Sequence, residues 1–420
     1  MAGSLWNRLT RNGRRLELWR SALAQHGLKE EESSRFPRAR LTARSGSVAV
    51  RITGARQENG IVVEVEGPEG FSVLKLRRET LHLFQREIEV GDQAFDGTFF
   101  IEAPLAAAYG LLDASTRDQL TETNAGCGSF EIGDGRLRVE IAEEGLPDVL
   151  PRLLDLGRRF ADLRNPERRI ARNARRDPKS RVRLLNLQLL ARECPGTPET
   201  LGVLRDACSD PNSAVRLRAA IELGAEGRDL LLTLAESSKD DAISSQAIAH
   251  LGGELPLELA RKILSHALRK GQGQTARACL EALGHHGAAV VGLLARVLAE
   301  RKGELAVAAA AALATTGEET AEPPLLQALQ SEDDDLRKAA VAALGRVGTA
   351  AAVQPLKEAA ERSWTEIGLR RAARQAVAEI QSRLAGAAPG QLSLADAEAG
   401  QLSLAAEAAG RLTLRGGRNA

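Results

Sequence analysis

The chain has 420 residues, a formal net charge of +1, 43% hydrophobic residues and 27% charged residues. This length predicts two or three domains, and the composition is that of a folded protein with a sizeable core. Bulk charge identifies no partner, and no apolar run approaches the ~20 residues of a membrane-spanning helix.

The cysteines stand far apart, without the spacing of a metal site or a disulfide framework. This favours reduced thiols and a cytoplasmic location. The four are Cys127, Cys194, Cys208 and Cys279.

Residues 1–46 form a basic segment in which apolar residues recur at roughly helical spacing. They are Leu5, Leu9, Leu16, Trp19 and Leu23. The pattern predicts a helix, or two helices separated at Asn12-Gly13. A helix that docks its apolar side on the protein is favoured. The alternative is an interfacial helix whose arginines meet acidic lipids.

Residues 47–163 change to a period of two, which predicts an α+β domain with an antiparallel sheet. Expected strands cover residues 47–53, 61–66, 71–76, 83–90, 99–101, 129–132 and 137–141. Helices are expected at residues 103–121 and 147–163. In the turn at residues 91–97, Asp92 and Asp96 are interpreted as solvated turn residues rather than metal ligands, because the spacing is not that of a calcium loop.

A basic block joins this domain to the next region, with eleven basic residues against three acidic ones between Arg158 and Arg183. It predicts contact with phosphate, the solvated face of a repeat, or contact with the acidic residues 318–335. Nucleic acid is not favoured, because no aromatic residues are interleaved. The expected partner-binding residues are Arg164, Arg168, Arg169, Arg172, Arg175 and Arg176.

A repeated pattern of 28 to 33 residues occupies residues 164–385. An aliphatic-arginine pair, as in Val215-Arg216, precedes a small residue and a closing aliphatic residue. Periods of this length predict helix pairs stacked as a solenoid. The small positions are Asn186, Ala219, Ala247, Cys279, Ala309, Ala340 and Ala373. Leu-Gly endings at Gly224, Gly252, Gly284 and Gly345 predict left-handed helix ends, and Asp177-Pro178 and Asp210-Pro211 predict helix starts.

These repeats resemble HEAT repeats, specifically the short bacterial form similar to the phycobilisome-lyase type. The copy that carries the resemblance best runs from Asp210-Pro211 through Val215-Arg216 and Ala219-Ala220 to Leu223-Gly224. The resemblance implies a superhelical all-α solenoid and a ladder of aspartates and arginines, expected to include Arg183, Arg216 and Arg337. It implies no particular activity, because a fold does not determine function.

The tail, residues 386–420, is of low complexity and has a ten-residue repeat, with Gly-Gln-Leu-Ser-Leu at residues 390–394 and 400–404 and Gly-Arg-Leu-Thr-Leu at residues 410–414. A disordered tail or a small strand-forming repeat is expected. Its expected partner-binding residues are Leu392, Leu394, Leu402 and Leu404.

The sequence therefore predicts a non-enzymatic scaffold or adaptor that binds protein partners, without catalytic residues, cofactor or metal. A lyase-like enzyme subunit similar to phycobilin lyases is the alternative. A membrane surface is a less favoured partner, through the N-terminal segment.

Overall fold

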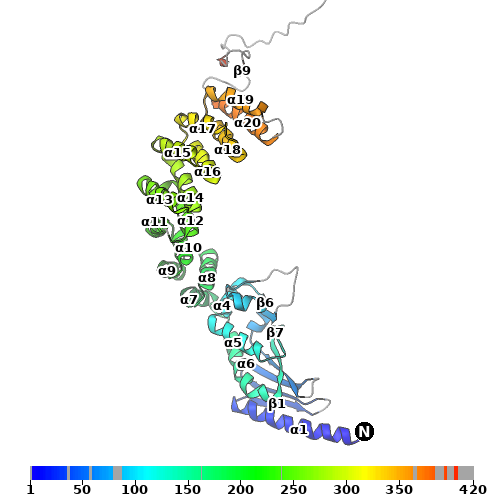
Figure 1. Cartoon of the computed structure of the whole chain (residues 1–420). Coiled ribbons are helices and arrows are strands. Elements are labelled where there is room, and N and C mark those ends of the chain that lie inside the picture. Colours follow the sequence, from blue (N-terminus) through cyan, green and yellow to red (C-terminus); the bar gives the residue numbers. More distant parts are fainter. Residues whose placement is uncertain are drawn as a thin grey trace, which may run out of the picture. The chain divides into compact units, whose positions relative to one another are not determined.

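The computed structural model describes residues 2–35, 38–55, 59–78, 88–161, 163–237, 239–362, 367–383, 392–394 and 402–404. Two compact units, residues 1–227 and 228–420, divide the chain. Each is described by itself (Figure 1).

The first unit contains an eight-stranded sheet in the order β1-β2-β3-β4-β8-β7-β5-β6, with antiparallel pairing throughout. The strands are β1 (Lys29–Ser34), β2 (Arg40–Ser45), β3 (Val48–Gly54), β4 (Gly60–Glu66), β5 (Lys75–Arg78), β6 (Phe99–Glu102), β7 (Ser129–Gly133) and β8 (Arg136–Ala142). The predicted α+β class with an antiparallel sheet is thus confirmed.

Two-residue alternation gives this sheet one apolar face. In β4, Ile61, Val63 and Val65 are fully buried, whereas the residues between them are half-exposed. Helices α1 (Ala2–Gln25) and α6 (Leu146–Phe160) pack against the sheet, and α6 faces it at Gly157, where an added Cβ would lie in van der Waals contact with Val65, at 3.4 Å. The opposite face carries cross-strand ion pairs such as Arg51–Glu66 at 2.8 Å.

Of the two alternatives for the N-terminal segment, the single helix is correct, because α1 runs through Asn12-Gly13 without interruption. The segment differs from its prediction after this helix, where residues 29–34 and 40–45 form β1 and β2 rather than helix. Alternation is obscured in β1 because its residues, KEEESS, are nearly all exposed at the edge of the sheet. Docking of α1 is confirmed for its second half, where Leu16, Trp19 and Leu23 are buried.

The rest of the sheet region follows the prediction with three local corrections. Residues 71–76 were expected to be one strand, but helix α2 (Gly70–Val73) precedes β5. Most of the strand expected at residues 83–90 lies outside the described residues. Helices α4 (Leu105–Leu111) and α5 (Ala114–Ala125) replace the single expected helical insert, and α3 (Gln93–Asp96) forms in the 91–97 turn.

Paired helices follow the sheet in the same unit. They are α7 (Pro166–Arg176) with α8 (Ser180–Glu193), and α9 (Pro198–Ala207) with α10 (Ser213–Leu223). One hydrophobic core runs from the sheet through Ile170 and Leu187 to Val215 and Ala219. The first compact unit therefore extends past residue 163, where the sequence suggested a domain boundary, and ends at residue 227.

The described residues of the second unit form five helix pairs (Figure 1), followed by two short strands in the tail. They are α11 (Arg228–Glu236) with α12 (Asp241–Leu251), α13 (Leu257–Lys270) with α14 (Gly273–Leu283), α15 (Ala288–Glu300) with α16 (Glu304–Thr316), α17 (Glu322–Ala328) with α18 (Asp334–Val347), and α19 (Val353–Arg362) with α20 (Ile367–Arg383). The second helices pack on one another in sequence, from α12 to α20.

The small positions lie where the repeat pattern predicts. Ala219, Ala247, Cys279, Ala309 and Ala340 are fully buried, and Asn186 and Ala373 are 1% exposed. A short side chain at this position lets a helix approach its neighbour closely.

Two predictions about helix ends are wrong in part. Gly224 and Gly252 have positive φ, but Gly284 is right-handed and Gly345 lies inside α18. Both of the latter provide space instead, since a Cβ on Gly284 would lie 2.8 Å from the Ala312 oxygen and one on Gly345 would lie 3.1 Å from Ala376.

The Asp-Pro pairs also lie outside the helices that they were expected to start. Helix α10 begins at Ser213 with Asn212 as its N-cap, and α8 begins at Ser180. Asp177 and Asp210 instead accept backbone N–H groups two residues later, from Lys179 and Asn212.

Candidate functional site

The predicted arginine site is centred on α7. Pro166 occupies the first turn, where a missing N–H costs nothing, and Ile170, Ala171 and Ala174 are buried. The opposite face carries arginines. Arg168, Arg172, Arg175 and Arg176 are exposed with Arg164, which precedes the helix, and Arg169 is half-buried.

Acidic side chains of the same unit neutralise much of this charge. Arg175 pairs with Glu199 at 2.8 Å and with Asp206 at 2.7 Å. Arg172 lies 3.8 Å from Asp113. Arg168 and Arg176 form no ion pair with a described residue, so their charges are not neutralised within the described part of the chain.

A buried ion network connects α5 to the loop between α7 and α8. The Arg117 guanidinium is 2% exposed and donates to both carboxylate oxygens of Asp177, at 3.0 and 3.1 Å, and to Asp92 at 3.1 Å. Burial lowers the pKa of Arg117, but the two carboxylates outweigh this and raise it. Asp92 is therefore a buried partner of an arginine, not the solvated turn residue predicted.

A second rung continues the network into the next helix pair. Arg183 donates to both oxygens of Asp210, at 2.7 and 2.8 Å, and to the Asp177 carbonyl at 2.7 Å. Burial raises the pKa of Asp210, but hydrogen bonds from Arg183 and from the Asn212 amide outweigh it and lower the pKa.

The predicted ladder is confirmed only at Arg183. Arg216 donates to the carbonyls of Asp210 and Pro211, and Arg337 to the carbonyl of Ser331 and to Asp334. These last two arginines hold the loops that precede their own helices. The sequence analysis missed Arg117. This residue lies in α5, outside the repeats, and pairs with Asp177 as an arginine of a preceding repeat would do in the ladder.

The second unit links its repeats by a different contact. Asp241, at the start of α12, accepts the backbone N–H groups of Gln274 at 3.1 Å and Thr275 at 2.9 Å, at the start of α14. Burial raises the pKa of Asp241, but the bonds from Thr275 and Gln274 outweigh it and lower the pKa.

An alanine-lined groove of about 300 Å³ crosses α14, α16 and α18 on the face of the second helices. Its surface includes Ala311, Thr315 and Ala342, which are exposed. Glu281, His285 and Arg346 form its polar edge. Short side chains leave this face open to a protruding side chain of a partner.

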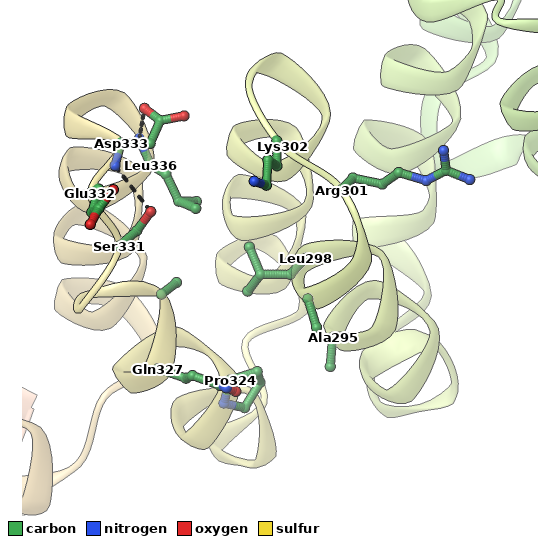
Figure 2. A pocket seen from close by; sticks show the side chains of 12 residues that line it. Ala295, Leu298, Arg301, Lys302, Pro324, Gln327, Ser331, Glu332, Asp333 and Leu336 are labelled. Atoms are coloured by element: carbon green, nitrogen blue, oxygen red, sulfur yellow. Dashed lines mark hydrogen bonds between the residues drawn. The ribbon is translucent and has the colours of Figure 1, made fainter.

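A second groove, of about 440 Å³, lies between α15 and the α17–α18 connection (Figure 2). Ala295, Leu298 and Lys302 line it from one side, and Glu332, Asp333 and Leu336 line it from the other. Asp333 is already engaged, because its side chain caps α18.

The cysteines show no sign of nucleophilic activation. Burial raises the pKa of Cys127 to about 11 and that of Cys279 to about 12, whereas reactive thiols have lowered pKa values. Within the described part of the chain, no three His, Cys, Asp or Glu side chains form a group that could hold a metal ion. None of the described helices is long and apolar enough to cross a membrane.

The predicted tail leucines lie in two short strands, β9 (Leu392–Leu394) and β10 (Leu402–Leu404). They pair antiparallel, with Leu402 opposite Leu394 and Leu404 opposite Leu392. The third repeat of the tail lies outside the described residues.

One part of the chain matches a known protein family. Residues 290–378, from α15 to α20, match the family described as HEAT repeats. Proteins of this type generally mediate protein–protein interaction. A search of the curated proteins finds no match.

Solved structures resemble the chain only distantly. An engineered protein has a TM-score of 0.34 at 17% identity, covering 57% of this chain and 74% of its own. The Escherichia coli protein YibA also has a TM-score of 0.34 at 17% identity, covering 51% and 92%. A mycobacterial trehalose monomycolate transport factor A has a TM-score of 0.26 at 15% identity, covering 37% and 94%.

Proposed function

We propose that this protein is a non-enzymatic scaffold or adaptor whose helix pairs form a superhelical HEAT-type solenoid. The alanine-lined groove across α14, α16 and α18 carries the proposal, since two of these helices lie within the HEAT match. The groove spans consecutive repeats, so one extended protein segment can contact several of them at once.

The exposed arginines of α7 form a second contact surface in this proposal. Arg168 and Arg176 have no ion-pair partner among the described residues, and Arg164, Arg169, Arg172 and Arg175 lie beside them in the sequence. Their charge suits an acidic protein surface. Nucleic acid is less suited, because the described part of α7 offers no aromatic side chain on which a base can stack.

The lyase-like alternative has no comparable support. The raised pKa values of Cys127 and Cys279 do not favour covalent chemistry at these thiols. A cytoplasmic location remains part of the proposal.

Site-specific photo-crosslinking tests the groove. A benzophenone amino acid at Thr315, on the groove, should crosslink a protein partner in cells. The same group at Arg296, an exposed residue of α15 that does not line the groove, is the matched control. Equal crosslinking at both positions, or none at Thr315, would contradict the proposed surface.

A further inference from the structure

A third groove, of about 490 Å³, lies between α19 and α20, with an apolar floor and a basic rim. Leu356, Ala360, Ala373 and Val377 form the floor. The rim carries three cations and one anion, namely Lys357, Arg370, Arg374 and Glu361. The groove therefore suits an apolar segment with negative charge.

Helical spacing extends this surface along α20. Ile367, Arg370, Arg374 and Val377 are separated by three, four and three residues, which places them on one side of the helix. Ile367 is 75% exposed, an unusual exposure for an isoleucine.

Comparison with the preceding repeat shows what is unusual about this surface. Arg370 and Val377 of α20 correspond to Arg337 and Leu344 of α18. Arg337 is bound to loop carbonyls and Leu344 is fully buried, in a helix against which α20 packs. Arg370 forms no ion pair with a described residue and lines the groove, and Val377 is only half-buried.

We propose that the chain's own tail, residues 386–410, occupies this groove through its leucine strands β9 and β10. Between Arg383 and Arg411 the sequence has no lysine or arginine, and its charged residues are Asp396, Glu398 and Glu407. The tail is thus acidic and leucine-containing, which complements the basic rim and the apolar floor.

The pairing of β9 with β10 supports this occupant. Residues directly opposite each other in a ladder share a face, so the register assigns Leu392, Leu394, Leu402 and Leu404 to one face. An isolated two-stranded hairpin is at best marginally stable in water. Packing on the groove supplies the apolar cover that the hairpin needs.

The covalent connection also favours binding within one chain. Eight residues separate Arg383 from Leu392, and they span up to roughly 28 Å when extended, more than the ~10–12 Å diameter of a helix. A short tether gives an effective concentration on the order of millimolar. A partner with the same chemistry must therefore displace the tail first.

Crosslinking in the full chain tests the contact. A benzophenone amino acid at Glu361, an exposed residue of the groove, should form an adduct with the tail in the monomer. Trypsin releases residues 384–411 as one peptide because no internal cleavage site is present, so mass spectrometry identifies the adduct. The same group at Ala342, exposed on α18, is the control and should give no tail adduct.

Charge reversal at the rim tests whether the tail adduct reflects specific binding rather than random collision. R370E/R374E should lower the adduct yield about tenfold, as expected for the loss and reversal of two ion pairs. In the unaltered rim, 1 M salt should also lower the yield because it screens exposed charges. If circular dichroism shows that the double variant is misfolded, the salt dependence of the adduct yield tests the proposed contact instead.

Three outcomes would overturn the proposal. They are equal tail adducts from positions 342 and 361, adducts only in a crosslinked dimer, and a yield insensitive to salt. The second outcome would assign the groove to a second copy of the chain. The Thr315 experiment reports separately on the α14–α18 groove.

Discussion

The helix pairs of the two units are held together by different chemistry. In the first unit, one buried arginine–carboxylate pair joins α5 to the α7–α8 connection, and a second joins α8 to the connection before α10. In the second unit, helices meet at glycine and alanine, and Asp241 links α12 to α14 through backbone N–H groups. The same repeat pattern thus supports two kinds of interface.

The two kinds of interface should fail differently when altered. A buried ion pair contributes little net stability, but removing one partner leaves an unpaired buried charge, which is costly. An interface of small residues contributes through packing, so it is sensitive to added volume. Substitutions in the two units can separate these effects.

The largest effect is expected from Arg117→Met. It leaves Asp177, whose side chain is 1% exposed, without its ion-pair partner, at a typical cost of about 3–5 kcal/mol. Urea unfolding of the first unit, followed by Trp19 fluorescence, measures it. Arg192→Met is the control, because the Arg192–Glu193 pair is exposed and worth at most about 1 kcal/mol.

Gly284→Ala should be the next most damaging substitution. The new Cβ would lie 2.8 Å from the Ala312 carbonyl oxygen, so the backbone must move, and overpacking typically costs about 1–3 kcal/mol. Gly292→Ala is the matched control, since nothing lies within 4 Å of its Cβ position in α15. That variant should gain roughly 0.5–1 kcal/mol. Equal effects of the two in thermal unfolding would contradict the close-packed interface.

The rung at Asp210 predicts a dependence on pH. Its pKa is lowered in the folded protein, so its stabilisation is present above the unfolded value of about 3.9 and is lost as pH falls through the folded pKa. At pH 7, Asp210→Asn should cost about 1.5–3 kcal/mol, as for other charge-assisted hydrogen bonds. The difference between wild type and variant should shrink toward pH 3; a constant difference would show that the charge of Asp210 is unimportant.

The smallest effect concerns Asp241 and its neighbour. Asp241→Ala removes the acceptor for two α14 amides and should cost about 1 kcal/mol, like the loss of a helix cap. Asp240→Ala removes the N-cap of α12 itself and should cost about the same. Hydrogen exchange distinguishes them, because the first should loosen the start of α14 and the second the start of α12.

The repeat core could be predicted from sequence because its signal is local and periodic. Ala247 and Ala309 recur at fixed positions relative to their aliphatic neighbours, and each is fully buried. The burial follows from the spacing of residues on a helix. The same logic located β3, β4 and β8.

Other features lacked such a signal. Arg117 and Asp177 are 60 residues apart, and one belongs to the α+β region while the other belongs to the repeats, so no period connects them. Gly284 and Gly345 follow a leucine, as helix-ending glycines do, but their role is set by the neighbouring repeat. For the α7 arginines, the sequence showed a cluster of positive charge. It could not show which acidic side chains, such as Glu199 and Asp206, would form ion pairs with them.

The position of Arg117 has a consequence for the order of folding. Domains fold largely as they are synthesised, N-terminal part first, and a stack of repeats can grow from any end already formed. Helix α5 therefore presents Arg117 before Asp177 has been synthesised. The first repeat meets a surface that already holds the opposite charge, so we expect the stack to grow from the sheet toward the C-terminus.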